Sequence, residues 1–422
     1  MDYDAAPAIA EERVGRGMAV LAWLPAVLAV WFLVAAENLV DIFLCLVLMA
    51  HAPTVLRLPP LERRRQLLIE MPAILLGTFG IAVLLVQGMA ALLDAPTPWL
   101  QAVQFGCYMS VWVLSLRLVY RGLQWLLLRV CKRQLLARVV TAVVMIGIGM
   151  PQLFVALQTR RVAIGKQPNA YFATKAQREV TFATDGGLML RGTLLTQPKS
   201  PESRPVAIVC HGLGANRANF FSYAQILWLL DCNVFAFDFR GHGQSEGVTT
   251  TLGGREASDV VAATNWVRSQ PQFANSKIVL VGISMGGASA LRAAADAKAD
   301  AVFTESAFAD LSTMLDERMS GLGPLRHFAS ASVRLAAYMQ LGVDLDEISP
   351  LRSLAALPAT VPVVLIHAAE DALIPVSHGH TLAAARPDLT LHLIEGAGHG
   401  GCTSAGWAQV KNHLEHLLAT LN

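Results

Sequence analysis

Charged side chains are scarce in this sequence, and its cysteines follow no metal-binding or disulfide pattern. Asp, Glu, Lys and Arg make up 15% of the 422 residues, whereas an ordinary soluble domain contains about 25%. The formal net charge is +2 and no long block of one sign occurs, so we expect no nucleic-acid partner. The six cysteines form no Cys-x-x-Cys pair, and no histidine lies at metal-binding spacing from them. We therefore expect neither a zinc site nor a disulfide framework.

Apolar residues make up 54% of the chain, and the excess is concentrated before residue 160. A helix needs about 20 apolar residues to cross a bilayer, because every backbone polar group must be hydrogen-bonded within the segment. A cleaved signal peptide explains only one such stretch. We therefore predict an α-helical transmembrane domain at 1–158 with about five spans. The spans are expected at 18–36, 39–56, 72–93, 99–116 and 139–158.

The basic residues of this region predict its orientation in the membrane. Lys and Arg collect after the second and the fourth predicted span, and the loop at 94–98 has none. Basic loops stay in the cytoplasm, so we expect a multi-pass integral membrane protein whose chain after Gln158 is non-cytoplasmic. Arg160, Arg161 and Lys166 follow the last span directly, and they favour the opposite side.

After a linker at 159–176, the sequence becomes an alternation of short apolar runs and helical patterns. A hairpin around Asp185-Gly186-Gly187 comes first. The later runs are rich in Val, Ile, Leu, Ala and Phe, which is typical of strands buried on both faces of a parallel sheet. These runs lie at 206–210, 233–237, 277–282, 301–304, 361–366 and 390–394. We predict an α/β domain at 177–422, with a mostly parallel sheet and helices on both faces. The stretch at 307–357 is too long for a simple crossover, and we predict a cap insertion there.

One serine follows a predicted strand and opens a predicted helix. Ser284 lies in Gly282-Ile283-Ser284-Met285-Gly286, and this context is the one that a G-x-S-x-G nucleophile elbow requires. The sharp turn brings neighbouring backbone close, so the two glycines must lack side chains. Ser284 is therefore the predicted nucleophile.

A serine hydroxyl needs a base and an acid that orients the base. His399 lies in a glycine-rich loop after the last predicted strand, and Asp371 follows the strand before it. The chain order Ser, Asp, His is the one expected for an α/β-hydrolase elbow. Glu370 and Glu305 remain weaker alternatives for the acid. Five other histidines lie near strand ends or in loops, where a structural role is more common: His211, His242, His367, His378 and His380.

Acyl transfer also needs donors for the developing oxyanion. The residue after the nucleophile, Met285, has its N–H at a helix amino terminus, where the dipole adds positive potential. The loop after the first parallel strand contains His211-Gly212-Leu213-Gly214. We predict an oxyanion hole made by the backbone N–H groups of Leu213 and Met285.

With these motifs in place, the chain from Arg178 to Asn422 resembles the α/β-hydrolase superfamily, in its branch of esterases, acylglycerol lipases and S33-type serine aminopeptidase-like proteins. The resemblance rests on the Asp371 segment with Ile374-Pro375 and on four motifs: HGLGAN at 211–216, DFRGHGQSEG at 238–247, VGISMGG at 281–287 and GAGHGG at 396–401. It implies an α/β-hydrolase fold, a triad of Ser284, Asp371 and His399, and a turn-shaping role for Asp238, Arg240 and His242.

Taken together, these patterns predict a membrane-anchored serine hydrolase that cleaves carboxylic esters through an acyl-enzyme. A lipid or acylglycerol ester is the expected substrate class, and the lipid bilayer is an expected partner. A serine peptidase or a thioesterase would use the same residues, and a non-catalytic membrane scaffold or transporter with a hydrolase-like domain is the third alternative. The mechanism needs no metal and no organic cofactor.

Overall fold

The computed structural model describes residues 150–159, 177–184 and 186–421, together with the single residues 120, 140, 147 and 149. Four of the predicted membrane spans lie outside the described residues, as does part of the fifth. Helix α8 (Met150–Thr159) covers the end of the fifth predicted span. In the described part of the chain, no helix combines the length and the apolar character needed to cross a bilayer. The transmembrane domain therefore stays a prediction.

The chain divides into two compact units. Residues 159–330 and 343–422 belong to one unit, and α8 and residues 331–342 belong to the other. The first unit holds every residue predicted to take part in catalysis, and the sheet lies within it.

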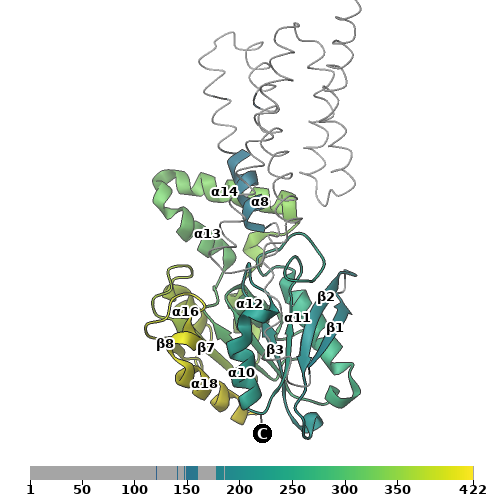
Figure 1. Cartoon of the computed structure of the whole chain (residues 1–422). Helices are drawn as coiled ribbons and strands as arrows, with labels where there is room; N and C mark the ends of the chain where they lie inside the picture. The colour runs from purple at the N-terminus through teal and green to yellow at the C-terminus, as the bar shows by residue number, and fades with distance from the viewer. Residues whose placement is uncertain are drawn as a thin grey trace, which may run out of the picture. The chain divides into compact units, whose positions relative to one another are not determined.

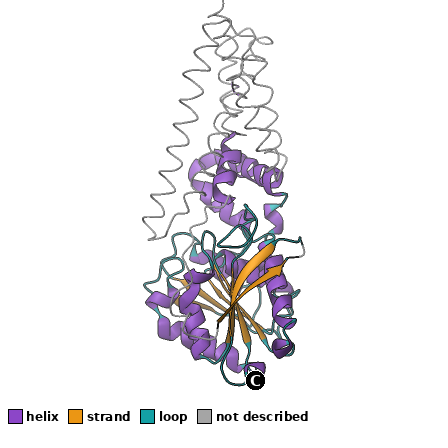
Figure 2. Ribbon diagram, turned by 45° about the vertical axis from the view of Figure 1, so that its right-hand side comes forward, coloured by secondary structure: helices purple, strands orange, loops and turns teal. Residues whose placement is uncertain are grey.

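Eight strands form one sheet in the order β1-β2-β4-β3-β5-β6-β7-β8 (Figure 2). The first two strands form an antiparallel hairpin, β2 pairs antiparallel with β4, and all the other pairs are parallel. The predicted mostly parallel α/β sheet is confirmed. The strands are β1 (Gln177–Ala183), β2 (Met189–Leu195), β3 (Val206–Cys210), β4 (Asn233–Phe237), β5 (Ile278–Ile283), β6 (Ala301–Glu305), β7 (Val363–Ala368) and β8 (Leu391–Ile394).

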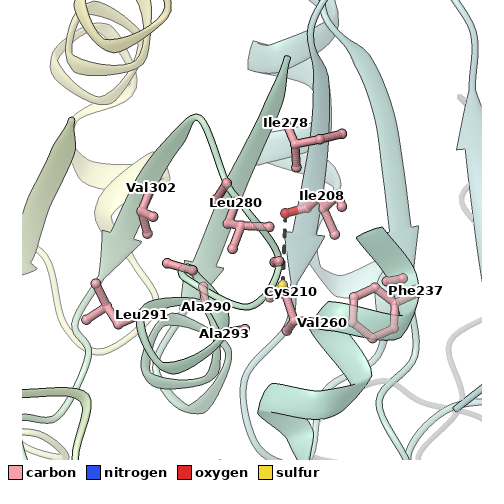
Figure 3. Close-up of a cluster of buried hydrophobic side chains, with 14 of the residues drawn as sticks. Ile208, Cys210, Phe237, Val260, Ile278, Leu280, Ala290, Leu291, Ala293 and Val302 are labelled. Carbon is pink, nitrogen blue, oxygen red and sulfur yellow. Dashed lines mark hydrogen bonds between the residues drawn. The ribbon is translucent and has the colours of Figure 1, made fainter. Parts of the chain in front are cut away.

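The central strands β3, β4, β5 and β6 are buried at every residue, because helices cover both faces of the sheet. Successive side chains of a strand point to opposite faces. Ile208 and Leu280 therefore lie in one core cluster, and Val209 and Val281 lie in the other. Figure 3 shows part of the first cluster, with Cys210 and Phe237 on neighbouring strands and Val260 and Leu291 on the covering helices.

The helices alternate with the strands along the chain (Figure 1). Side chains of α11, α12, α15 and α16 enter the first core cluster, and those of α10 and α18 enter the second. These helices are α10 (Phe221–Leu229), α11 (Glu256–Arg268), α12 (Met285–Ala293), α15 (Pro350–Ala356), α16 (Val376–Ala383), α17 (Cys402–Ala405) and α18 (Trp407–Ala419).

The segment predicted as a cap lies between β6 and β7 and is helical. It comprises α13 (Leu311–Met319), α14 (Arg326–Leu341) and α15, joined by the short 3₁₀ turns η6 (Ser320–Leu325) and η7 (Leu345–Glu347). Its last helix also belongs to the sheet layer, since Leu354 and Leu357 are buried in the first core cluster. A lid function for α13 and α14 remains a prediction.

Candidate active site

Ser284 occupies the sharp turn between β5 and α12, with φ 57° and ψ −124°. This is a strained conformation for a residue with a side chain. A Cβ atom added to Gly282 would lie 2.4 Å from the Gly286 carbonyl oxygen, and one added to Gly286 would lie 2.1 Å from the Cys210 carbonyl oxygen. Both positions therefore require glycine, as the elbow motif predicts.

His399 and Asp371 lie within hydrogen-bonding distance of each other and of the serine. His399 Nε2 is 2.9 Å from Ser284 Oγ, and His399 Nδ1 is 2.7 Å from Asp371 Oδ2. With Nδ1–H donating to the carboxylate, Nε2 is left to accept the serine proton. The structure thus brings together three residues that are 115 and 28 positions apart in the chain.

The Asp371 carboxylate is buried, and its second oxygen is also satisfied. Oδ1 accepts hydrogen bonds from the N–H groups of Leu373 (2.9 Å) and Ile374 (2.8 Å). Burial by itself would raise the pKa of Asp371, but the hydrogen bonds from His399 and Ile374 outweigh it and lower the pKa below its ordinary value. Asp371 therefore stays ionised opposite His399.

The alternative acids are not placed against His399. Glu370 is exposed, although it is the neighbour of Asp371. Glu305 is fully buried, but its carboxylate accepts hydrogen bonds from Tyr223 Oη–H and from the Cys402 N–H. Asp371 is the carboxylate that contacts the histidine.

Four of the other five histidines hydrogen-bond to backbone groups; for His378, Nδ1 accepts from the Ala309 N–H at 3.2 Å. His211 Nε2 accepts from the Phe239 N–H at 3.0 Å, and burial lowers the pKa of this ring well below its ordinary value. His242 Nε2 accepts from the Gly214 N–H at 3.2 Å. His367 Nε2–H donates to the Ile374 carbonyl oxygen at 2.9 Å. These contacts indicate a structural role for the imidazole rings.

The loop after β3 passes directly beside the serine. A Cβ atom added to Gly212 would lie 3.4 Å from Ser284 Cβ. The Gly214 N–H donates to His242 and the Ala215 N–H donates to the Gly212 carbonyl oxygen. The N–H groups of Leu213 and Met285 donate to no acceptor in the described part of the chain, and Met285 opens α12. Both donors predicted for an oxyanion hole are thus free.

The DFRGHG segment is held by its own ion pairs. The buried Asp238 carboxylate accepts from the N–H groups of Arg217 and Gln244, both at 2.8 Å, and pairs with the Arg217 side chain. The Arg240 side chain pairs with buried Asp259. Neither ion pair includes a residue of the predicted triad, in keeping with the turn-shaping role that the resemblance implies.

Two further residues, Glu305 and Ser306, contact the loops that carry the triad. The sequence did not predict these contacts. Ser306 follows β6 with φ 49°, and its hydroxyl helps to lower the pKa of Asp371. Its Oγ also accepts from the Ala368 N–H at 3.2 Å. Glu305 was considered only as an acid. The sequence contains one signal for such a role of Glu305, because this charged residue ends an otherwise apolar strand. A carboxylate buried at that position needs hydrogen-bond donors from neighbouring segments.

No cluster of three or more His, Cys, Asp or Glu side chains is arranged to hold a metal ion among the described residues. The cysteines Cys210, Cys232 and Cys402 are free and buried. Burial raises the pKa of the Cys232 thiol to about 12, which keeps it protonated. None of the three is an activated thiol.

Part of the chain matches a family model and two curated relatives. Residues 207–410 match the family model described as "Alpha/beta hydrolase family". The chain is similar to the uncharacterized protein YfhR of Escherichia coli O157:H7, with 28% identity over 209 residues that cover 48% of this chain and 66% of that protein. It is also similar to the uncharacterized protein YqkD of Bacillus subtilis (strain 168), with 28% identity over 300 residues that cover 67% of this chain and 95% of that protein. The match thus spans just under two thirds of YfhR and nearly all of YqkD.

The fold is also similar to that of solved structures. The Pyrococcus furiosus esterase Pf2001 aligns with a TM-score of 0.51 and 21% sequence identity, over 62% of this chain and 98% of that chain. At this identity the likeness shows the fold alone. The chain has the α/β-hydrolase fold, and the match of residues 207–410 to the family model supports a hydrolase.

Proposed function

We propose that this protein is a serine hydrolase that cleaves carboxylic esters through an acyl-enzyme intermediate. The observation that carries the proposal is the unbroken chain of hydrogen-bonding contacts from Ser284 Oγ through His399 to Asp371. The free N–H groups of Leu213 and Met285 beside the serine support it further. The site residues all follow the carboxyl ends of parallel strands: the nucleophile follows β5, the acid β7, the base β8, and the two oxyanion donors follow β3 and β5.

The geometry supports the following sequence of steps. Ser284 Oγ attacks the ester carbonyl carbon while His399 Nε2 takes the hydroxyl proton. The carbonyl oxygen becomes an oxyanion, which accepts hydrogen bonds from the Leu213 and Met285 N–H groups. His399 then gives its proton to the departing alkoxide, and an alcohol leaves. Water, deprotonated by His399, attacks the acyl-enzyme and releases the acid with Ser284 restored.

We further propose a membrane anchor and a lipid or acylglycerol ester as substrate. The support is the set of long uncharged stretches before Gln158, because anchoring holds an active site near substrates dissolved in the bilayer. The non-cytoplasmic side is the proposed location of the hydrolase part. Protease accessibility of that part in sealed vesicles tests this proposal, since protection from protease added on the non-cytoplasmic side contradicts it.

A fluorophosphonate probe tests the nucleophile. The probe should label the full-length wild type, and Ser284→Ala should abolish labelling because it removes the hydroxyl that His399 contacts. Ser289→Ala is the matched control, since this buried hydroxyl lies on the same helix and donates to the Met285 carbonyl oxygen. Labelling of Ser284→Ala at the wild-type level would refute the assignment.

A substrate panel separates esters from the alternatives. We expect the full-length chain to hydrolyse p-nitrophenyl esters and acylglycerols faster than thioesters or aminoacyl anilides of matched acyl groups. A higher kcat/KM for the anilides would instead favour a peptidase, and a higher value for the thioesters would favour a thioesterase. Ser284→Ala serves as the background in each assay.

A further inference from the structure

The carboxyl end of β6 contacts the loops of all three triad residues, although it contributes none of them. The Glu305 carbonyl oxygen accepts the N–H of Ser284 at 2.8 Å, which extends the β5–β6 ladder into the elbow. The next residue, Ser306, contacts the acid loop: its Oγ accepts from the Ala368 N–H at 3.2 Å, three residues before Asp371. Its own N–H donates to the Ile366 carbonyl oxygen at 3.0 Å. Two consecutive residues thus hold the elbow and the acid loop.

The Glu305 side chain reaches the third loop. Its Oε1 accepts from the Cys402 N–H at 3.1 Å. Cys402 begins α17, three residues after His399, and the turn between them closes with the Gly401 N–H donating to the Gly398 carbonyl oxygen at 2.9 Å. The carboxylate therefore holds the base of the turn that carries the histidine.

Burial makes this carboxylate an unusual choice for the position. The Glu305 residue is 0% exposed, and within the described residues its side chain takes part in no ion pair. The Tyr223 hydroxyl donates to its second oxygen. A buried carboxylate without a cation lowers the free energy of unfolding, whereas an apolar side chain of the same size would not. The groups that its two oxygens bind, the Tyr223 hydroxyl and the Cys402 N–H, therefore explain why a carboxylate occupies this position.

We infer that Glu305 and Ser306 are positioning residues for the triad, which together hold the Ser284 backbone, the loop that carries Asp371 and the turn that carries His399. The inference rests on the proposed function. Neither residue touches the reacting atoms. Their effect is exerted through the 2.9 Å distance between His399 Nε2 and Ser284 Oγ, and a misplacement of about 1 Å can lower a rate about 100-fold.

Two substitutions of Glu305 separate positioning from charge. Glu305→Met keeps the size of the side chain and removes both acceptors, so kcat for p-nitrophenyl butyrate should fall about 100-fold. KM should change little, because no substrate contact is removed. Glu305→Gln keeps an amide oxygen for the Cys402 N–H and offers its NH₂ to the Tyr223 oxygen. It should retain most of the wild-type kcat.

Leu227→Ala is the control for a general loss of stability, since this buried side chain lies on the same helix as Tyr223 and contacts the second core cluster. It should lower Tm and leave kcat unchanged. The inference is overturned if Glu305→Met keeps the wild-type kcat, if Glu305→Gln is as impaired as Glu305→Met, or if Leu227→Ala loses kcat equally. If Glu305→Met does not fold, Ser306→Ala decides: a lower kcat at constant KM supports the inference, and an unchanged kcat overturns it.

These outcomes are distinct from a failure of the proposed function. In that case the wild type itself would neither hydrolyse the ester nor react with the fluorophosphonate at Ser284.

Discussion

At the scale of single residues, the site depends on hydrogen bonds that fix which nitrogen of His399 carries a proton. Asp371 accepts from three groups at once: His399 Nδ1–H and the N–H groups of Leu373 and Ile374. A carboxylate can only accept, so Nδ1 must be the protonated nitrogen and Nε2 the free one. The acid thereby makes His399 a base toward Ser284.

Asp371→Asn tests this assignment. The asparagine NH₂ group can donate to His399 Nδ1, which would move the ring proton to Nε2 and leave no acceptor for the serine proton. We expect kcat to fall by about 10⁴-fold while Tm changes little, as measured with p-nitrophenyl butyrate. Glu370→Gln is the matched control, because it alters the neighbouring exposed carboxylate. Equal activity of the two variants would contradict the role of Asp371.

Sequence reasoning succeeded where a role depends on local chain geometry and failed where it depends on contacts between strands. The elbow of Ser284 and the positions of Asp371 and His399 after successive strands follow from short motifs. The part played by Glu305 does not, because Cys402 and Tyr223 are 97 and 82 residues away from it. A single sequence contains no signal for such a pairing.

At the scale of elements, strand positions were predicted to within about two residues, since continuous apolar runs mark buried parallel strands. The predicted runs at 233–237 and 206–210 coincide with β4 and β3. The cap boundary was harder to predict. Helix α15 falls inside the predicted cap but packs in the sheet core through Leu354, and amphipathic spacing does not reveal which surface a helix covers.

The last strand and the last helix share a pair of histidines that should respond to pH. The rings of His392 on β8 and His413 on α18 have centroids 4.1 Å apart. Burial lowers the pKa of both, and for His413 the proximity of His392 adds to the effect. The unfolded chain therefore binds more protons than the folded chain once the pH falls below about 6.5.

We accordingly expect the free energy of unfolding to fall between pH 7 and pH 5, and His413→Phe to reduce that fall by removing one titrating ring and the repulsion between the two. Urea unfolding of both proteins at each pH measures the difference. Identical pH dependence in wild type and variant would show that the pair contributes nothing.

At the scale of the whole molecule, one buried arginine ties the antiparallel edge of the sheet to its parallel part. Arg217, after β3, pairs with Asp238 at the end of β4 and with Glu179 on β1. Its Nε–H also donates to Thr193 Oγ1 on β2 at 3.0 Å. Strands β1 and β2 and the DFRGHG loop are thus joined through one side chain.

Arg217→Met should therefore destabilise the fold by about 3–5 kcal/mol, because it leaves the buried Asp238 carboxylate without its cation. Arg204→Met is the control, since the Arg204–Asp231 pair is exposed and surface pairs contribute about 0–1 kcal/mol. Chemical denaturation of the full-length variants gives both values. If both variants lose the same free energy of unfolding, the buried pair contributes no more to stability than the exposed pair.

The residues of the site lie at the carboxyl ends of β5, β7 and β8, so its completion follows the order of synthesis. β8 is an edge strand of the sheet and holds His399 in the loop that follows it. A growing chain has formed the elbow of Ser284 and supplied Asp371 before its base exists. A ribosome-bound chain that ends before His399 would therefore carry a strained but unreactive serine, and this serine would acquire its base only after the final strand has joined the sheet.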